Sequence, residues 1–368
     1  MLKSHFDISQ RGGTEEDLVE EEEEEEVEEA VTRSESSVVD EAKKVTVLKT
    51  KPTFAERKLN RSEVSVRQSL LGKTADGDGY AFLKATCTGM QLTNIRAIAS
   101  FKHLQFVDVS DNFLTTEALQ VVTKIPFLVL IHADKNHLDS AYLKKSKYLQ
   151  VIIMNSNNIS SVFDVYHPEL STLEVGNNEI AKIDFRDRMP TLRCLDFRYN
   201  RISDISNLNF PNLDSLYLAG NKISSLVGIE NLVNLRILHV RNNPIKLLNG
   251  FNADHTKLQY INLRNCKVIT MMQVKKLQCL PALEVIVLKG CPFMGGTGEE
   301  GTEVEEDDSE LRIEVLATLP RLKRLNKGVF TPEERSEAKN LMVQILEEGE
   351  NAAEEGSEEA LDEDTNDM

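Results

Sequence analysis

The stretch LDSLYLAGNKI, Leu213–Ile223, contains the pattern that decides the fold. It reads L-x-x-L-x-L-x-x-N-x-I, and its central L-x-L alternates with period two, which is typical of a short strand with both leucines on one face. The Asn follows where the chain must turn away from the sheet, and its amide can satisfy backbone groups of the turn and of neighbouring coils. Because one such unit cannot bury its own apolar face, the pattern predicts a stack of units.

The same pattern recurs along most of the chain. Successive units start 21 to 25 residues apart, and ten copies at a steady period indicate a repeat protein. The first copy is degraded, with Ala85, Cys87 and Met90 at the marked positions. The units are Phe82–Leu92, Leu104–Leu114, Leu128–Leu138, Leu149–Ile159, Leu170–Ile180, Leu192–Ile202, Leu213–Ile223, Leu235–Ile245, Leu258–Val268 and Leu283–Phe293.

The Asn positions are expected to form a structural ladder along the turns. In the last two repeats Cys266 and Cys291 replace Asn, since a small thiol tolerates burial. These two cysteines are 25 residues apart and form no C-x-x-C pair, so we do not expect them to bind a metal. The ladder comprises Asn112, Asn136, Asn157, Asn178, Asn200, Asn221 and Asn243.

The segments after each Asn favour short 3₁₀ turns over full helices, because apolar residues there recur every three residues, as in Ile223–Leu232. The predicted fold is therefore an α/β solenoid. It is a leucine-rich repeat horseshoe of about ten short, intracellular-type repeats, with capping helices and disordered acidic tails. The repeats occupy residues 82–294.

Caps are expected at both ends of the solenoid. Residues 59–81 are predicted as the N-terminal cap, with a helix over Asn60–Leu71 that begins at an Asn60/Glu63 capping box and stops at Gly72. Residues 311–346 are predicted as a C-terminal repeat cap and helix. Leu319–Leu325 resembles one more half-repeat, and Thr331–Leu346 is expected to be the closing helix.

Charge is distributed unevenly. The chain carries 43 basic and 60 acidic residues, a formal net charge of -17, but three segments hold much of the negative charge. They are an acidic then basic N-terminal arm (1–58) with the run Glu20–Glu26, an acidic loop insertion (295–310) and an acidic tail (347–368). Like-charge runs of this kind repel themselves, so we expect the arm and the tail to be disordered. The repeats between them are basic.

Several classes of protein are not expected. No apolar run approaches the ~18–20 residues of a membrane helix, and Met1–Gly13 has no apolar signal core. The five scattered cysteines, without such a signal, do not indicate a disulfide framework. The basic linker Lys43–Lys73 lacks an aromatic platform, so we do not expect nucleic-acid binding.

The concave face of the predicted sheet is the candidate partner-binding surface. Its outward strand positions turn basic toward the C-terminal repeats, and Arg and Tyr on a rigid scaffold are residue types that anchor interfaces. The alternative is that exposed strands simply carry such residues. The candidate partner-binding residues are Arg198, Tyr217, Ile237, His239, Arg241, Tyr260, Arg264 and Lys289.

Catalysis finds no support in the pattern. His132 and His239 share a register position but lie five predicted strands apart, roughly 24 Å by strand spacing, so they cannot form one acid–base pair. Ala75–Gly79 is best interpreted as a turn, and Gly295–Gly301 lacks the Lys of a phosphate loop. We expect a protein that is not an enzyme and has no cofactor or metal.

With the repeats placed, the chain resembles the leucine-rich repeat proteins of ciliary radial spokes, over about Leu59 to Leu346. The flanks carry the resemblance more than the repeats, because many intracellular proteins share such repeats. An acidic arm is also usual in that family. The matching stretches are Arg67–Lys84, Leu92–Ile95, His103–Leu114, Leu226–Leu235, Leu258–Cys266 and, as the closest match, Pro320–Ala338.

The resemblance implies a non-enzymatic scaffold of the third axonemal radial spoke, which supports spoke assembly and motility. Its implied partners are other radial-spoke or axonemal proteins, with the microtubule doublet as a further candidate. Its implied location is the cytoplasm, cytoskeleton and ciliary or flagellar axoneme. Two alternatives stay open: a regulatory or targeting subunit of a Ser/Thr phosphatase, and an acidic-tailed nuclear repeat protein that binds histones.

Overall fold

A computed structural model of the chain describes residues 54–299 and 308–345. The chain divides into two units, Met1–Ala55 and Glu56–Met368. Apart from Phe54 and Ala55, every described residue belongs to the second unit, the repeat body. Most of the predicted N-terminal arm, the centre of the predicted insertion and the predicted acidic tail lie outside the described residues.

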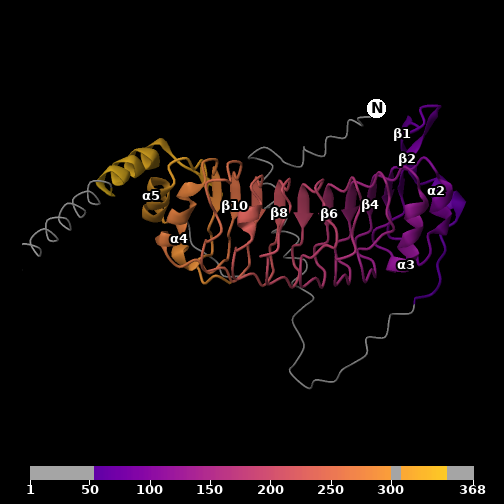
Figure 1. Ribbon diagram of the computed structural model, residues 1–368, viewed down its shortest axis with the longest axis horizontal. Helices are drawn as coiled ribbons and strands as arrows, with labels where there is room; N and C mark the ends of the chain where they lie inside the picture. Colours follow the sequence, from indigo (N-terminus) through magenta and orange to yellow (C-terminus); the bar gives the residue numbers. More distant parts are fainter. Residues whose placement is uncertain (1–53, 300–307, 346–368) are drawn as a thin grey trace, which may run out of the picture. The chain divides into compact units, whose positions relative to one another are not determined.

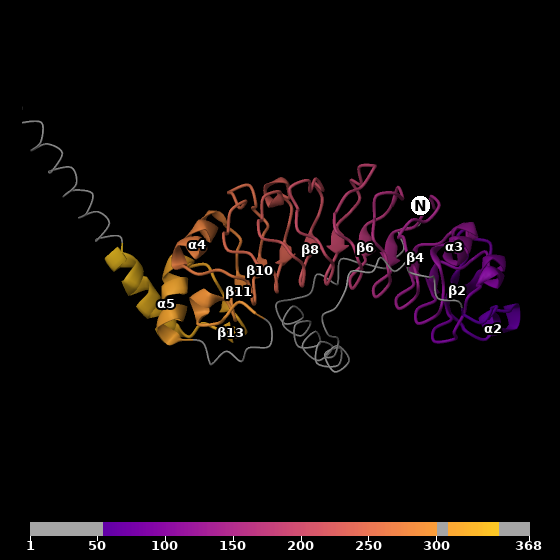
Figure 2. The ribbon, with the colours of Figure 1, turned by 90° about the horizontal axis from the view of Figure 1, so that it is seen from below.

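The repeat body is built on one thirteen-stranded sheet whose strands follow one another in chain order. Strands β2 to β12 are parallel, and an antiparallel strand is added at each end. Figure 1 shows the strands side by side along the long axis, and Figure 2 shows the repeat body as an arc with the sheet on its inner side. The strands are β1 Gln68–Lys73, β2 Tyr80–Thr86, β3 Phe106–Asp108, β4 Leu130–His132, β5 Val151–Ile153, β6 Thr172–Glu174, β7 Cys194–Asp196, β8 Ser215–Tyr217, β9 Ile237–His239, β10 Tyr260–Asn262, β11 Val285–Val287, β12 Arg324–Leu325 and β13 Gly328–Val329.

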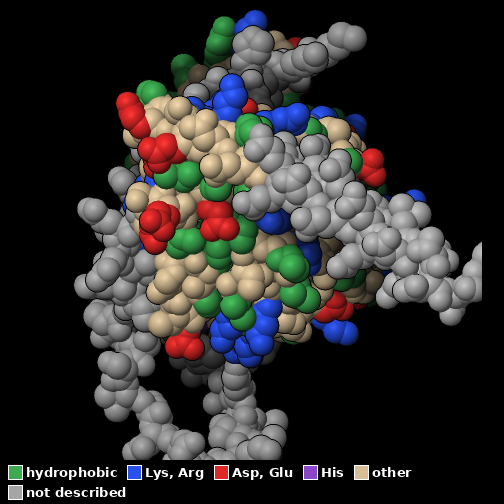
Figure 3. Space-filling view, turned by 90° about the vertical axis from the view of Figure 1, so that its left-hand side faces the viewer, with side chains coloured by type: hydrophobic (Ala, Val, Ile, Leu, Met, Phe, Trp, Pro, Cys, Tyr) green, Lys and Arg blue, Asp and Glu red, His purple; other side chains and the backbone are tan. Residues whose placement is uncertain are grey.

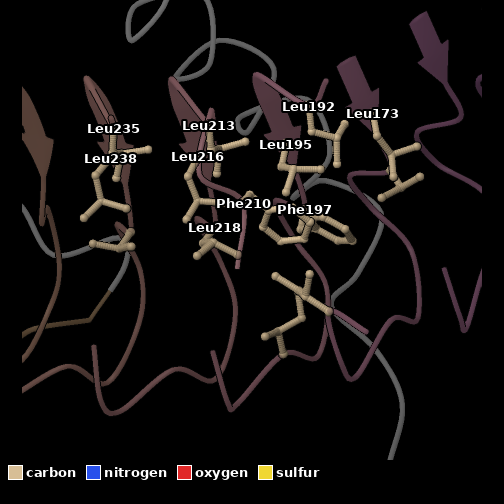
Figure 4. Close-up of a cluster of buried hydrophobic side chains, with 14 of the residues drawn as sticks. Leu173, Leu192, Leu195, Phe197, Phe210, Leu213, Leu216, Leu218, Leu235 and Leu238 are labelled. Carbon is tan, nitrogen blue, oxygen red and sulfur yellow. The ribbon is translucent and has the colours of Figure 1, made fainter. Parts of the chain in front are cut away.

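The inward leucines stack from repeat to repeat to form the core. Leu173, Leu195, Leu216 and Leu238 are partners in register on four successive strands, and all four are fully buried. Figure 4 shows them one beside the next, with Phe197 filling the space below the strands. Each repeat therefore buries its apolar side against its neighbours, as the period predicted.

The outer side of the arc carries short helical turns. The 3₁₀ turn η4 (Ile229–Asn231) confirms the prediction made from residues 223–232. Two longer repeats add an α-helical turn before the 3₁₀ turn, which accommodates their extra residues. The other short helical elements between the strands are η2 Arg96–Ser100, α3 Thr116–Leu119, η3 Gln120–Lys124, α4 Met271–Lys275, η5 Lys276–Cys279 and η6 Pro292–Met294.

The Asn ladder has the predicted role. In each rung the side-chain amide donates to backbone carbonyls of its own turn and of the preceding repeat, and its oxygen accepts a backbone N–H. Asn178 is representative: Nδ2 donates to the carbonyls of Met154 (3.1 Å), Val175 (3.0 Å) and Gly176 (2.9 Å). Its Oδ1 accepts from the backbone N–H of Ile159 at 2.9 Å. The ladder thus ties neighbouring repeats together through buried polar groups.

Two cysteines extend the donor side of this ladder. The Cys266 thiol donates to the Val240 carbonyl at 3.2 Å, and the Cys291 thiol donates to the Leu263 carbonyl at 3.1 Å. Burial raises the pKa of Cys291 to about 12 and the pKa of Cys266 well above its usual value. Cys at this position therefore substitutes for the amide donor and remains an uncharged thiol.

The N-terminal cap differs from the prediction. The capping box of Asn60 and Glu63 is present, but the helix α2 spans only Arg61–Ser65. The chain then turns into β1, which pairs antiparallel with β2, so the helix predicted over Asn60–Leu71 is wrong in its second half. The open edge of β2 provides backbone partners that outweigh the local helical pattern. The residues 75–79 form the turn of this hairpin, as expected.

The C-terminal cap contains one predicted and one unpredicted helix. Residues 332–345 are helical after a capping box in which Thr331 Oγ1 accepts from the Glu334 N–H at 3.2 Å. The helix α5 (Ser309–Thr318) was not expected. The two are joined by Arg312, whose Nε lies 2.6 Å from Glu334 Oε1 and whose guanidinium lies 4.9 Å from the centre of the Phe330 ring. The predicted half-repeat is confirmed as β12, which pairs with β11.

Candidate functional site

The eight predicted partner-binding residues lie together on the concave face, which consists of the outward positions of β3 to β12. Arg198, Tyr217, Arg264 and Lys289 are partly exposed. The other four are buried: Ile237 is 0%, His239 and Arg241 are 3%, and Tyr260 is 2% exposed. The structure therefore places all eight on one strip, but only the first four present accessible surface.

Three rings on successive strands form a stack in this strip. The His239 ring centre on β9 lies 4.8 Å from that of Tyr217 on β8 and 4.8 Å from that of Tyr260 on β10. Burial, followed by the charges of Arg198 and Arg241, lowers the pKa of His239 to about 3. Neither His239 ring nitrogen has a hydrogen-bond partner within the described ranges. His239 is consequently a neutral, stacking side chain at neutral pH.

Two arginines are held in fixed positions beside the stack. Arg198 binds Asp196 through Nε (3.0 Å to Oδ2) and Nη2 (2.8 Å to Oδ2), and its guanidinium lies 5.5 Å from the Tyr217 ring centre. Arg241 Nη2 donates to the hydroxyl of Tyr199 at 2.9 Å. Because Arg198 is partly exposed and already oriented, less conformational entropy is lost when a partner binds it.

A second cluster, which the sequence analysis did not identify, lies near the other end of the face. His132 on β4 is placed between two carboxylates, with Nδ1 3.5 Å from Asp108 Oδ2 and Nε2 3.0 Å from Asp134 Oδ2. The signal was present in the sequence, because the register puts Asp108 on the strand next to His132 and Asp134 two positions beyond it.

The ionisation of this cluster follows from its contacts. Hydrogen bonds to Asp108 and Asp134 raise the pKa of His132 to about 10. Burial would raise the pKa of Asp108, but hydrogen bonds from His132 and Ser110 outweigh it and hold the value at about 2. His132 is therefore a cation at neutral pH, and a protonated ring cannot act as a general base.

Metal-binding clusters and membrane-spanning helices are absent from the described ranges. No three His, Cys, Asp or Glu side chains there are placed to hold a metal ion. His132 and His239 lie on β4 and β9, five strands apart as predicted. None of the helices within these ranges has the length and apolar character needed to cross a bilayer.

The C-terminal end of the repeat body has a hollow of about 530 Å³. It is lined mainly by apolar side chains of the last full repeat, of the α5 end and of the closing helix, including Leu280, Leu319 and Met342, with Lys275 and Arg321 also present. Figure 3 shows hydrophobic side chains gathered on this end, with acidic side chains to one side. The hollow contains no catalytic constellation and is a secondary candidate for contact with other proteins.

Comparison with known proteins places these features in a family. The family model for leucine-rich repeats (2 copies) matches residues 190–231 and 211–253. Leucine-rich repeat-containing protein 23 of Homo sapiens is 34% identical over 284 residues, 77% of this chain and 79% of that protein. The Mus musculus protein of the same name is 36% identical over 282 residues, 76% of this chain and 79% of its own length.

Solved structures align more loosely with this chain. The functional domain of InlJ from Listeria monocytogenes aligns with a TM-score of 0.41 at 18% identity, over 67% of this chain and 62% of that chain. The internalin InlF from the same organism aligns with a TM-score of 0.39 at 14% identity, over 70% of this chain and 92% of that chain. The extent and identity of the sequence matches, on a leucine-rich repeat solenoid, show that the chain belongs to the leucine-rich repeat-containing protein 23 family.

Proposed function

We propose that the chain is a non-enzymatic scaffold subunit of the third axonemal radial spoke, which supports spoke assembly and ciliary or flagellar motility through protein–protein contacts. Leucine-rich repeat proteins generally act as interaction scaffolds, and membership of the family supports that part of the proposal. The spoke assignment rests on the resemblance of the flanking stretches, above all residues 320–338.

The concave face is the observation that carries the proposal. It combines a rigid sheet, an aromatic stack and oriented arginines, whereas its two histidines are fixed in states that do not suit acid–base catalysis. Oriented Arg and Tyr side chains are typical anchors of protein interfaces. A surface of this kind suits binding to other subunits more than turnover of a small molecule.

The first experiment is localisation of the tagged full chain in a flagellated cell after detergent extraction. Retention on the axoneme at regular spoke spacing is the expected result. A soluble chain bound stoichiometrically to a Ser/Thr phosphatase would overturn the proposal in favour of a targeting subunit. A nuclear chain with salt-sensitive histone binding would overturn it in favour of a histone-binding protein.

A charge-reversal variant connects retention to the concave face. Arg264→Glu with Lys289→Glu changes two partly exposed bases without removing the ion pair of Arg198, and we expect it to abolish retention. The matched control is Lys182→Glu with Arg188→Glu, which reverses two exposed bases outside the concave face and should leave retention intact. Equal retention of both variants would show that another surface holds the chain.

A further inference from the structure

The charges of the concave face are sorted along the solenoid. The outward positions of β3 to β6 carry the acids Asp108, Asp134 and Glu174 and no Lys or Arg. The outward positions of β9 to β12 carry bases and no acid. These bases are Arg241, Arg264, Lys289 and Arg324.

The boundary between the two halves is neutral and aromatic. On β7 Asp196 and Arg198 pair with each other, and β8 presents Tyr217 between Ser215 and Ala219. An aromatic ring at this point carries no net charge and offers contact area to an apolar side chain. From β3 to β12 the concave face therefore has an acidic end, a neutral aromatic centre and a basic end, and β2 adds the exposed Lys84 beside the acidic end.

Accessible charges exist at both ends. The side chains of Asp108 and Asp134 are 18% and 23% exposed, and Glu174 is partly exposed. Arg264, Lys289 and Arg324 are partly exposed at the other end. Protonated His132 offsets one acid of the first half, so the basic end carries the stronger field.

We propose that the concave face binds one polypeptide segment of a partner protein, with a basic stretch over β3 to β6 and an acidic stretch over β9 to β11. The inference rests on the proposed interaction function and names the chemistry of its partner. Like charges at either end oppose the reverse placement, so the face fixes both the position and the direction of the segment.

The length of the segment follows from the strand spacing. From β4 to β11 there are seven spacings of about 4.8 Å, or roughly 34 Å. An extended chain covers that distance with about 10 residues. A peptide of about 12 residues is therefore long enough to test the proposal.

The test uses two labelled peptides of identical composition and the full chain. One has three Lys at one end, a Gly/Ser/Leu centre and three Glu at the other, and the second has Lys and Glu alternating along its length. We expect fluorescence anisotropy at low salt to give about 10-fold tighter binding of the segregated peptide. A photo-crosslinker at its acidic end should label residues 258–289, and one at its basic end should label residues 106–176.

Charge reversal supplies the compensating arm of the test. Arg264→Glu with Lys289→Glu should weaken binding of the segregated peptide about 10-fold and favour a peptide with Lys at both ends. The control variant, Lys182→Glu with Arg188→Glu, should bind the segregated peptide and the peptide with Lys at both ends with the same affinities as the wild type. Restored binding through the compensating peptide separates a local charge effect from misfolding.

Three outcomes would overturn the proposal. The first is equal affinity for the segregated and alternating peptides, and the second is crosslinks spread over both halves. The third is binding that appears only after Glu20–Glu26 is replaced by Gln, because the natural occupant would then be the chain's own acidic run. Axonemal retention of the full chain together with any of these would preserve the scaffold function and remove only this description of its partner.

Discussion

The two halves of the concave face place a histidine at the same repeat position and give it opposite charge states. His132 on β4 lies between two carboxylates and has a pKa of about 10, whereas His239 on β9 is buried between two rings beside arginines and has a pKa of about 3. Position in the repeat therefore fixes where a side chain lies, and the neighbouring strands fix its protonation.

The two halves also differ in the hydrogen bonds that their ladder residues make inside the solenoid. Asn178, in the half near His132, makes four hydrogen bonds to backbone groups of the preceding repeat and its own. Cys266, in the half near His239, makes one, through its thiol. The two repeats with cysteine rungs therefore keep the donor to the preceding repeat but lose the side-chain acceptor, and Ile245 N–H donates instead to the Asn243 carbonyl at 2.8 Å.

The largest expected difference between the halves is the cost of removing a rung. Asn178→Leu leaves several buried carbonyls and one N–H without their partner, so we expect a loss of about 3 kcal/mol in the free energy of unfolding. Chemical denaturation of the full chain measures it. The matched control is Asn158→Leu, which replaces an exposed Asn of the preceding repeat. Its free energy of unfolding should stay within about 0.5 kcal/mol of the wild-type value. An unchanged midpoint for Asn178→Leu would contradict the structural role of the ladder.

The next difference is acid sensitivity in the half of His239. Its folded pKa of about 3 is below the unfolded value of about 6.5, so its stabilising contribution is present above pH ~6.5 and falls as the pH drops toward ~3. We expect about 2 kcal/mol of stability to be lost between about pH 7 and about pH 4.5.

His239→Phe keeps a stacking ring and cannot be protonated, so its stability should depend less on pH over this interval. The pKa of His167 is also lowered by burial, to about 4, and contributes with the same sign in both proteins. The difference between wild type and His239→Phe therefore isolates His239. Parallel pH profiles would show that His239 is not kept neutral by the fold.

In the half of His132, we expect the stability to depend on pH with the opposite sign. Because its folded pKa of about 10 is above the unfolded value of about 6.5, its contribution is complete below pH ~6.5 and is lost as the pH rises through ~10. The ring is partly exposed, so solvent screening reduces the effect to about 1 kcal/mol. Titration of the His132 ring protons by NMR measures the pKa, and His132→Gln is the control for stability. A midpoint near 6.5 would contradict the two ion pairs.

The repeats were predictable from the sequence because the residue pattern that specifies each one is short and recurs many times. The inward leucines, the Asn ladder, the 3₁₀ turn after Ile223 and the half-repeat before the closing helix all follow from one pattern. Register also placed the eight candidate residues on one strip. Whether the face binds a partner stays a prediction.

The features that could not be predicted depend on contacts between segments that are distant in the sequence. Residues 68–73 have a helical pattern but pair with the edge of β2, a partner that the local pattern does not reveal. The burial of Ile237 and Tyr260 could not be inferred from alternation, which gives the side of a strand and not its exposure. The contacts of His132 with Asp108 and Asp134 follow only when residues of neighbouring strands are compared, and a comparison of distant strands does not show them.

The smallest expected effect concerns the cysteine rungs and separates two explanations of why Cys is found there. If the thiol acts as a hydrogen-bond donor, Cys266→Ser should preserve the bond to the Val240 carbonyl and cost less than Cys266→Ala, which should lose about 1 kcal/mol. If Cys266 serves only as a small apolar group, Ala should be tolerated better than Ser, because a buried hydroxyl without a partner is costly. The partly exposed Cys279→Ala is the control for removal of a thiol. Denaturation midpoints of the three variants decide between the explanations, since the order of Ser and Ala reverses from one to the other.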